Sequence, residues 1–193
     1  MLIMIAGLVL FLGMHSVRMV APEWREAQIQ RMGEGPWKGI YSVVSIIGLA
    51  LAIWGYGQMR HDPIFIWSPP IGLYHLVALF MIPAFILLVA AFVPRNHIRA
   101  RLGHPMVLAV KTWAFSHLLA NGRMGDIIFF GAFLVWTVFV YRFLRQRDRA
   151  VGVAPEAATA SGTAIAVVLG VVAYWVFATY LHVWVAGVPA FTW

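Results

Sequence analysis

The long apolar segments of this chain constrain its fold more than any other feature. An α-helix needs about 20 apolar residues to cross a bilayer. Because the bilayer interior offers no water to backbone groups, such segments form helices rather than loops or open sheets. The sequence therefore predicts an all-α, polytopic membrane helix bundle that forms a single domain over residues 1–193. The five predicted spans are 1–20, 39–59, 73–93, 126–143 and 164–185.

Composition supports this class and excludes several others. Only 11% of the residues are charged, against about 25% in a typical soluble domain. The chain has no cysteine, which excludes disulfides, thiolate metal sites and cysteine nucleophiles. It also shows no paired carboxylates, Gly-rich phosphate loop or Ser-His-Asp set, so hydrolase and NTPase chemistry has no support. The net charge is +7, and most of the basic residues lie between the spans. Membrane topology explains this distribution better than nucleic-acid binding does.

A sixth apolar segment, 106–121, is shorter than the other five. As a helix it would cover about 24 Å, less than the roughly 30 Å of a hydrocarbon core. Pro105 suits the first turn of this helix, and Asn121-Gly122 suits its end. The sequence thus predicts about six transmembrane helices, the short one crossing a thin region or lying shielded inside the bundle.

The basic residues also predict an orientation. The first, third and fifth loops hold eleven Lys and Arg residues, whereas the second and fourth hold one each. The positive-inside rule places the odd-numbered loops in the cytoplasm and both termini outside. Residues 147–163 then form a flexible cytoplasmic linker within the domain. The amphipathic segment 21–38 is expected to lie at the membrane surface.

Histidines are the main candidates for function. The chain has seven, of which His61 and His97 lie in predicted loops as solvated residues. His15, His117 and His182 lie within apolar helices, where each ring must find a partner. That partner is either a neighbouring helix, through a hydrogen bond, or a metal such as haem iron, for which imidazole is a standard axial ligand.

Helix geometry limits how these histidines can pair. His104 and His117 would lie about 20 Å apart on one helix, so they cannot bind opposite faces of one haem. His117 shares an apolar face with Trp113, which would suit a porphyrin or ordinary helix packing, and His15 lies on a similar face. His104 is expected to cap a helix or bind a lipid headgroup.

Two cations lie inside or beside the spans. Arg18 and Lys111 either extend to the cytoplasmic surface or contact an anionic group such as a haem propionate or an anionic substrate. Asp126 stands at the predicted start of a helix, where the helix dipole favours a carboxylate.

The run GHPMVLAVKTWAFSHLLANG at 103–122, and the pair His15-Ser16 with Arg18 after it, closely resemble the NnrU family. This resemblance implies a protein of the bacterial cytoplasmic (inner) membrane that is associated with denitrification, in the handling of nitrite and nitric oxide. The family is related to zeta-carotene isomerase, a membrane protein in which histidines hold haem b.

By this resemblance, His15 and His117 would be the metal ligands of haem b. The cofactor-binding set implied or suggested by the sequence is His15, Arg18, His104, Lys111, Trp113 and His117. The isomerase has an alternative thiolate ligand that would fall near Ala114, but a chain without cysteine cannot switch to a thiolate.

Three functions follow as hypotheses. The first is an NnrU-type haem b protein for redox sensing, electron transfer or nitric-oxide handling. The second is a haem-dependent cis–trans isomerase or oxidoreductase that acts on a polyene or another apolar substrate. The third is a non-catalytic accessory subunit of a respiratory complex. The expected partners are membrane lipids and respiratory or denitrification proteins, and no nucleic acid.

Overall fold

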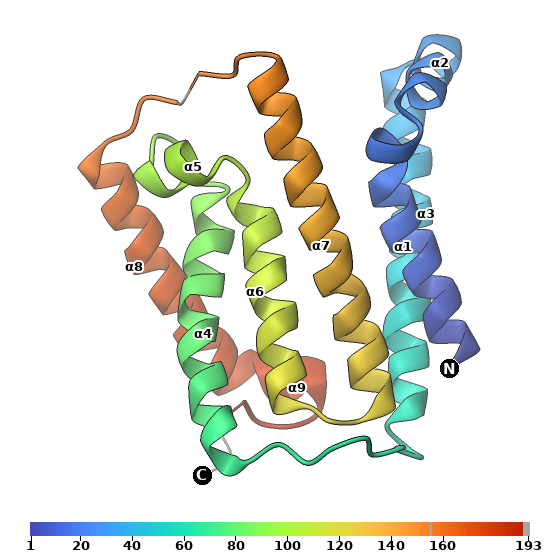
Figure 1. Cartoon of the computed structure of the whole chain (residues 1–193), viewed down its shortest axis with the longest axis vertical. Coiled ribbons are helices and arrows are strands. Elements are labelled where there is room, and N and C mark those ends of the chain that lie inside the picture. Colours follow the sequence, from blue (N-terminus) through green and yellow to red (C-terminus); the bar gives the residue numbers. More distant parts are fainter. Residues whose placement is uncertain (155, 191–193) are drawn as a thin grey trace. The chain divides into compact units, whose positions relative to one another are not determined.

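The computed structural model describes residues 1–154 and 156–190 and is helical almost throughout (Figure 1). Five of its helices are long and apolar enough to cross a membrane, which confirms the predicted all-α, polytopic membrane fold. In chain order the helical elements are α1 Leu2–Val20, α2 Pro22–Met32, α3 Glu34–Met59, α4 Ile71–Ala90, α5 His97–Leu102, α6 Pro105–Ala120, α7 Met124–Ala150, α8 Ala160–Val176, the π-helical turn η1 Phe177–Leu181 and α9 His182–Ala186.

The helices pack as two compact units. The first unit comprises Met1–Trp67 and Arg123–Trp136, and the second comprises Ser68–Gly122 and Thr137–Trp193. Helix α7 contributes its first half to one unit and its second half to the other. Each unit is described by itself below, and the prediction of a single domain stays a prediction.

Direct backbone contact between α1 and α3 holds the first unit together. A Cβ atom at Gly7 would overlap the backbone nitrogen of Ala52, and one at Gly48 would lie 2.7 Å from the backbone nitrogen of Phe11. A Cβ atom at Gly55 would overlap the backbone of Met4, which is completely buried. Small residues allow this approach, which is how membrane helices gain van der Waals contact without a hydrophobic driving force.

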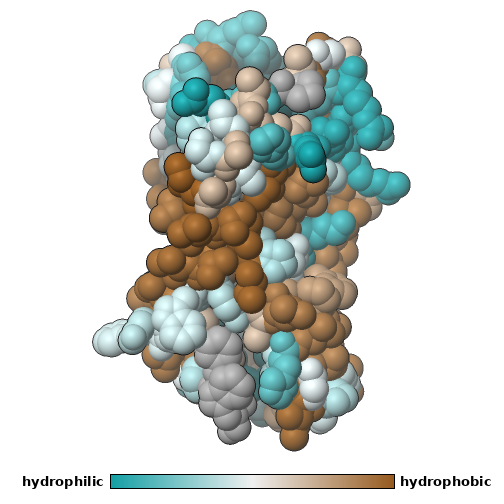
Figure 2. All heavy atoms as spheres, turned by 90° about the vertical axis from the view of Figure 1, so that its left-hand side faces the viewer, coloured by the Kyte–Doolittle hydropathy of each residue, from teal (hydrophilic) through white to brown (hydrophobic). Residues whose placement is uncertain are grey.

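In the second unit, α4 packs against both α6 and α8. Glycines again permit close contact, because a Cβ atom at Gly170 would lie 2.6 Å from the Cα atom of Ile86. The outward surface of α8 carries large apolar side chains, including Ile165, Val168 and Trp175, each at least half exposed. Figure 2 shows a broad hydrophobic zone on this face, with hydrophilic side chains gathered at its upper end. That distribution matches a helix surface in contact with lipid.

A buried asparagine fixes the turn between α4 and α5. The Asn96 side chain donates hydrogen bonds to the carbonyl oxygens of Ala90 (2.9 Å) and Val93 (2.6 Å). It accepts a third from the backbone N–H of Arg99 (2.7 Å), which makes it the N-cap of α5. With only 1% of its surface exposed, Asn96 replaces the water that these backbone groups would otherwise need.

Loops assigned by charge to the same side of the membrane contact one another. Phe65 forms a β-bridge with Arg123, which joins the second and fourth loops, and Asn96 forms one with Thr159, which joins the third and fifth. Helix α6 has only 16 residues, but it runs antiparallel to α4 along most of that helix (Figure 1). These observations agree with a sixth crossing by α6. The side that faces the cytoplasm stays a prediction.

The predicted linker 147–163 is too long at both ends. Helix α7 continues to Ala150, because the run from 142 to 150 consists mainly of good helix formers. Helix α8 begins at Ala160, because the Thr159 hydroxyl caps it by accepting a hydrogen bond from the backbone N–H of Gly162 (3.1 Å). The described residues between the two helices are therefore 151–154 and 156–159, and Pro155 lies outside the described residues.

The amphipathic segment 21–38 is not one continuous element. Helix α2 ends at Gly33, whose φ of 87° suits a glycine. Helix α3 begins at once, five residues before the predicted start at residue 39. Trp24 packs edge-on against Trp37 with 5.7 Å between the ring centroids, so α2 folds back on α3.

Asp126 lies in the first turn of α7, as predicted. Only 2% of the residue is exposed, and its carboxylate accepts hydrogen bonds from the Tyr56 hydroxyl and the backbone N–H of Arg123. The carboxylate therefore joins the start of α7 to the end of α3 within the first unit, a role beyond the predicted dipole effect.

Candidate functional site

The site in the first unit centres on His15, in the second half of α1. Its Nδ1 lies 2.8 Å from the carbonyl oxygen of Phe11, one turn earlier. A carbonyl can only accept, so Nδ1 carries the proton and Nε2 carries the lone pair. A backbone carbonyl that holds one ring nitrogen in this way is the usual support for a histidine that binds a metal through the other.

Aromatic rings surround this imidazole. The ring centroids of Phe11, Tyr41 and Trp136 lie 4.3, 5.2 and 6.1 Å from that of His15. The neighbouring Ser16 hydroxyl donates to the carbonyl of Leu12 (2.6 Å) and accepts from the Trp136 indole N–H (3.0 Å). Ser16 of the predicted His15-Ser16 motif thus supports its neighbour, because it holds the Trp136 indole that packs edge-on against His15.

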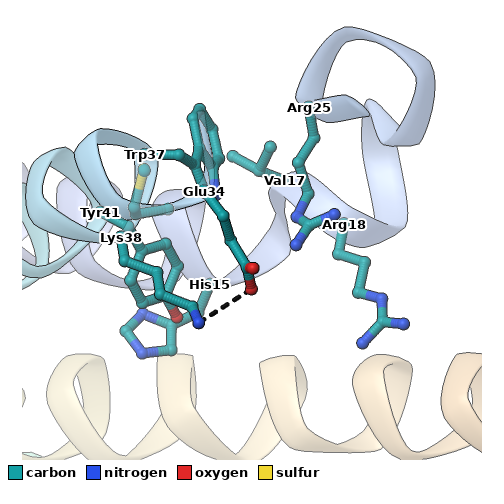
Figure 3. A pocket seen from close by; sticks show the side chains of 9 residues that line it. His15, Val17, Arg18, Arg25, Glu34, Trp37, Lys38 and Tyr41 are labelled. Carbon is teal, nitrogen blue, oxygen red and sulfur yellow. Dashed lines mark ion pairs between the residues drawn. The ribbon is translucent and has the colours of Figure 1, made fainter. Parts of the chain in front are cut away.

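A cavity of about 280 Å³ opens beside His15. It is bounded by the end of α1, the start of α2 and the start of α3, as the close-up in Figure 3 shows. Its lining combines apolar or aromatic side chains with charged ones. The lining residues are Met14, His15, Val17, Arg18, Arg25, Glu34, Trp37, Lys38 and Tyr41.

Three cations and one carboxylate make up the charged part. The Lys38 ammonium lies 2.8 Å from the Glu34 carboxylate, and both side chains are about 70% exposed (71% and 70%). The Arg25 guanidinium also acts electrostatically on Glu34. In Figure 3 the Glu34 carboxylate lies between these two cations, and the Arg18 side chain extends from α1 away from them. The cavity therefore carries an excess of positive charge.

His117 has the same local support on α6, in the second unit. Its Nδ1 lies 2.9 Å from the carbonyl oxygen of Trp113 and therefore donates to it. The two rings are also in contact, with 5.3 Å between centroids. The carbonyl of His117 in turn accepts from the side-chain amide of Asn121 (2.8 Å), the residue at which α6 ends, as predicted.

His104 occupies the N-cap position of α6, as predicted, but its side chain makes no capping bond. Its Nε2 lies 2.8 Å from the carboxylate of Asp148 on α7 and donates to it. Arg147 adds a contact of 3.5 Å to the same carboxylate. The His104 side chain thus links α6 to α7 within the second unit. Lys111 lies half-buried on α6.

The structure brings together only part of the predicted site. His15 and Arg18 line one cavity, whereas the other four predicted residues belong to the second unit. The sequence did not reveal four further lining residues as site residues, namely Arg25, Glu34, Lys38 and Tyr41. Glu34, Lys38 and Tyr41 follow one another at spacings of four and three, which places them on one helix face. That spacing could have grouped them, but only the packing of α1 on α3 shows that this face lies beside His15.

No cluster of three or more metal-binding side chains exists in the described part of the chain. A centre held by several protein ligands, such as a structural zinc site, would need such a cluster. A porphyrin brings four ligands of its own and needs one or two from the protein. The donor set around His15 therefore fits haem iron better than a bare metal ion.

The contact between His104 and Asp148 leads to a test of its contribution to stability. We expect both His104→Ala and Asp148→Ala to lower the thermal unfolding midpoint of the purified protein, because each removes the hydrogen bond between α6 and α7. The double variant should unfold at the same temperature as the less stable of the two single variants, since each change removes the same contact. Additive effects in this double-mutant cycle would show that the two side chains act independently.

The fold and the site together define a polytopic helical membrane protein with a backbone-supported histidine beside a cation-lined cavity. A sequence model of one family, described as NnrU protein, matches residues 3–190. Because this match covers nearly the whole chain, the protein belongs to the NnrU family, as the resemblance predicted. Comparisons with curated proteins and with solved structures found no match.

Proposed function

We propose that this NnrU-type membrane protein binds haem b, with His15 as an axial ligand of the iron. The observation that carries the proposal is the hydrogen bond from Nδ1 of His15 to the carbonyl of Phe11. This hydrogen bond leaves the lone pair on Nε2, the ring nitrogen that points away from the helix backbone. The side chains of Phe11, Tyr41 and Trp136 surround the imidazole. Aromatic side chains suit the apolar faces of a porphyrin.

His117 is proposed as the second axial ligand. Its imidazole has the same kind of backbone bond as that of His15, so its Nε2 also carries the lone pair. The pairing joins residues of two different units and stays a prediction from the sequence. Since the chain has no cysteine, both protein ligands in this proposal are imidazoles.

A bound haem would supply one-electron redox chemistry and an iron that can bind nitric oxide. The residues of this chain would hold the iron, fix the ring orientation and shield the ring from water. We propose that the protein serves in the bacterial cytoplasmic membrane as a redox sensor, electron carrier or nitric-oxide handling protein in denitrification.

The visible absorption spectrum tests this proposal. Protein purified from cells supplied with a haem precursor should show a Soret band, and His15→Ala should lose most of it because the iron loses its ligand. In His117→Ala, the bands should change from a low-spin to a high-spin pattern if the second imidazole is lost.

His182→Ala is the matched control. His182 lies half-buried in the second unit, outside the cavity beside His15, and its Nδ1 also bonds to a backbone carbonyl, that of Val188 (2.8 Å), so this variant should keep the wild-type spectrum. Folded wild-type protein that takes up no haem, or an unchanged spectrum in His15→Ala, would rule the proposal out.

A further inference from the structure

We infer that the cationic side of the cavity, formed by Arg18, Arg25 and Lys38, binds the propionate groups of the haem, and that Glu34 competes with them for this position. This inference rests on the proposed function, because it assigns the same cavity to one edge of the same ligand. It goes further by naming the residues that orient the ring and the residue that opposes its entry.

The mixed lining of the cavity suits one edge of a haem. The imidazole of His15 and the ring of Tyr41 line it together with the cations Arg18, Arg25 and Lys38, and Figure 3 shows these side chains in one close-up. A haem carries both propionates on one edge, so its iron and its carboxylates face different surroundings. A cavity of about 280 Å³ is smaller than a whole porphyrin, so the propionate edge would enter it while the opposite edge extends beyond it.

The cations come from three different helices, which suits two carboxylates better than one. Arg18 lies in the last turn of α1, Arg25 lies on α2, and Lys38 lies on α3. Arg25 is the least exposed, with 32% of its side chain accessible, and its guanidinium lies 3.6 Å from the exposed carboxylate of Glu26. A guanidinium can hold a carboxylate through two parallel hydrogen bonds. Arg25 is therefore expected to contribute more to binding than the exposed Lys38.

Glu34 already occupies the position of a ligand carboxylate. Its side chain contacts Lys38 at 2.8 Å and also faces Arg25. Because an exposed ion pair between residues four apart on a helix contributes little stability, this contact can exchange for a propionate at small cost. Glu34 thus offsets part of the positive charge while the cavity holds no ligand, and it must turn away from Lys38 when a propionate binds there.

The test compares haem b with its dimethyl ester, which keeps the iron and the ring but lacks the negative charges. Haem-free protein in detergent is titrated with each porphyrin, and the Soret band reports binding. We expect Arg25→Ala/Lys38→Ala to bind haem b about tenfold more weakly, because charge-assisted hydrogen bonds are lost. Affinity for the dimethyl ester should stay within about twofold. Comparing variant with wild type for the same porphyrin cancels differences in partitioning into detergent.

Glu34→Gln should have the opposite effect. Removing the competing carboxylate should strengthen haem b binding about twofold to fivefold and leave the dimethyl ester unaffected. The matched control is Arg31→Ala, which removes an exposed cation on α2 that does not line the cavity and should change neither affinity. Thermal unfolding of each variant confirms that it is folded.

The outcomes separate this inference from the proposed function. If wild-type protein binds neither porphyrin, both are overturned. If wild-type protein binds both porphyrins, and the double variant has equally lowered or unchanged affinity for both, haem binding stands and the propionate site is overturned. Selective weakening of haem b, with strengthening in Glu34→Gln, supports the site.

Discussion

Gly7→Leu should prevent the first unit from assembling. A side chain at this position would enter the backbone of α3 at Gly48 and Ala52, where even a Cβ atom would lie 2.6 Å from the carbonyl oxygen of Gly48. Neither helix can yield by rotating a side chain, because the contact is with backbone atoms. We expect a loss of about 3 kcal/mol or more in the free energy of unfolding, with α1 separating from α3.

The measurement is the yield of monodisperse protein in size-exclusion chromatography and its thermal midpoint in detergent. Gly13→Leu is the matched control, because it makes the same change on the same helix where no other atom lies within 4 Å of the new Cβ position. It should behave like wild type. A similar loss of yield and thermal midpoint in both variants would mean that a leucine is not tolerated at either glycine of α1. The contact between α1 and α3 would then not explain the effect of Gly7→Leu.

Asn96→Leu should destabilise the second unit to a similar degree. The substitution leaves the carbonyls of Ala90 and Val93 and the N–H of Arg99 without their partner. Each buried polar group that loses its hydrogen bond costs about 1–3 kcal/mol, so the total should reach about 3 kcal/mol or more. Because the turn at Asn96 also holds Thr159 through a β-bridge, the connection to α8 should loosen as well.

Hydrogen exchange followed by mass spectrometry would locate this effect at 91–103 and 151–163. For comparison, Asn121→Leu removes a single side-chain bond, to the carbonyl of His117, at a half-buried position, and should cost only about 1 kcal/mol. If Asn96→Leu were no more destabilising than Asn121→Leu, the hydrogen bonds of Asn96 would be dispensable.

The lengths of the apolar runs in the sequence predicted most of the fold. All five long spans and the short α6 were found from the apolar runs, because a bilayer requires continuous helix. The errors lie where polar or small residues extend a helix, at residues 147–150 of α7, 160–163 of α8 and 34–38 of α3. Apolar periodicity does not detect such ends, whereas local propensity and capping decide them.

The site was less predictable than the fold. The sequence pointed to His15 and Arg18, which do line one cavity, but it did not reveal Glu34 or Tyr41. Their part in the site depends on how α3 packs against α1, and that register is set by Gly7, Gly48 and Gly55. A glycine in an apolar helix does not reveal its partner, so the sequence alone could not place α3 beside His15.

The glycine contacts between α1 and α3 also limit how this protein can respond to a ligand. Each glycine lies opposite backbone of the facing helix, so sliding either helix by one turn would bring a larger side chain into the same gap. Piston-like movement of α1 along α3 is therefore blocked. A ligand at His15 would instead act on neighbours outside this contact, such as the side chains that line the cavity, the short helix α2 and Trp136 of α7.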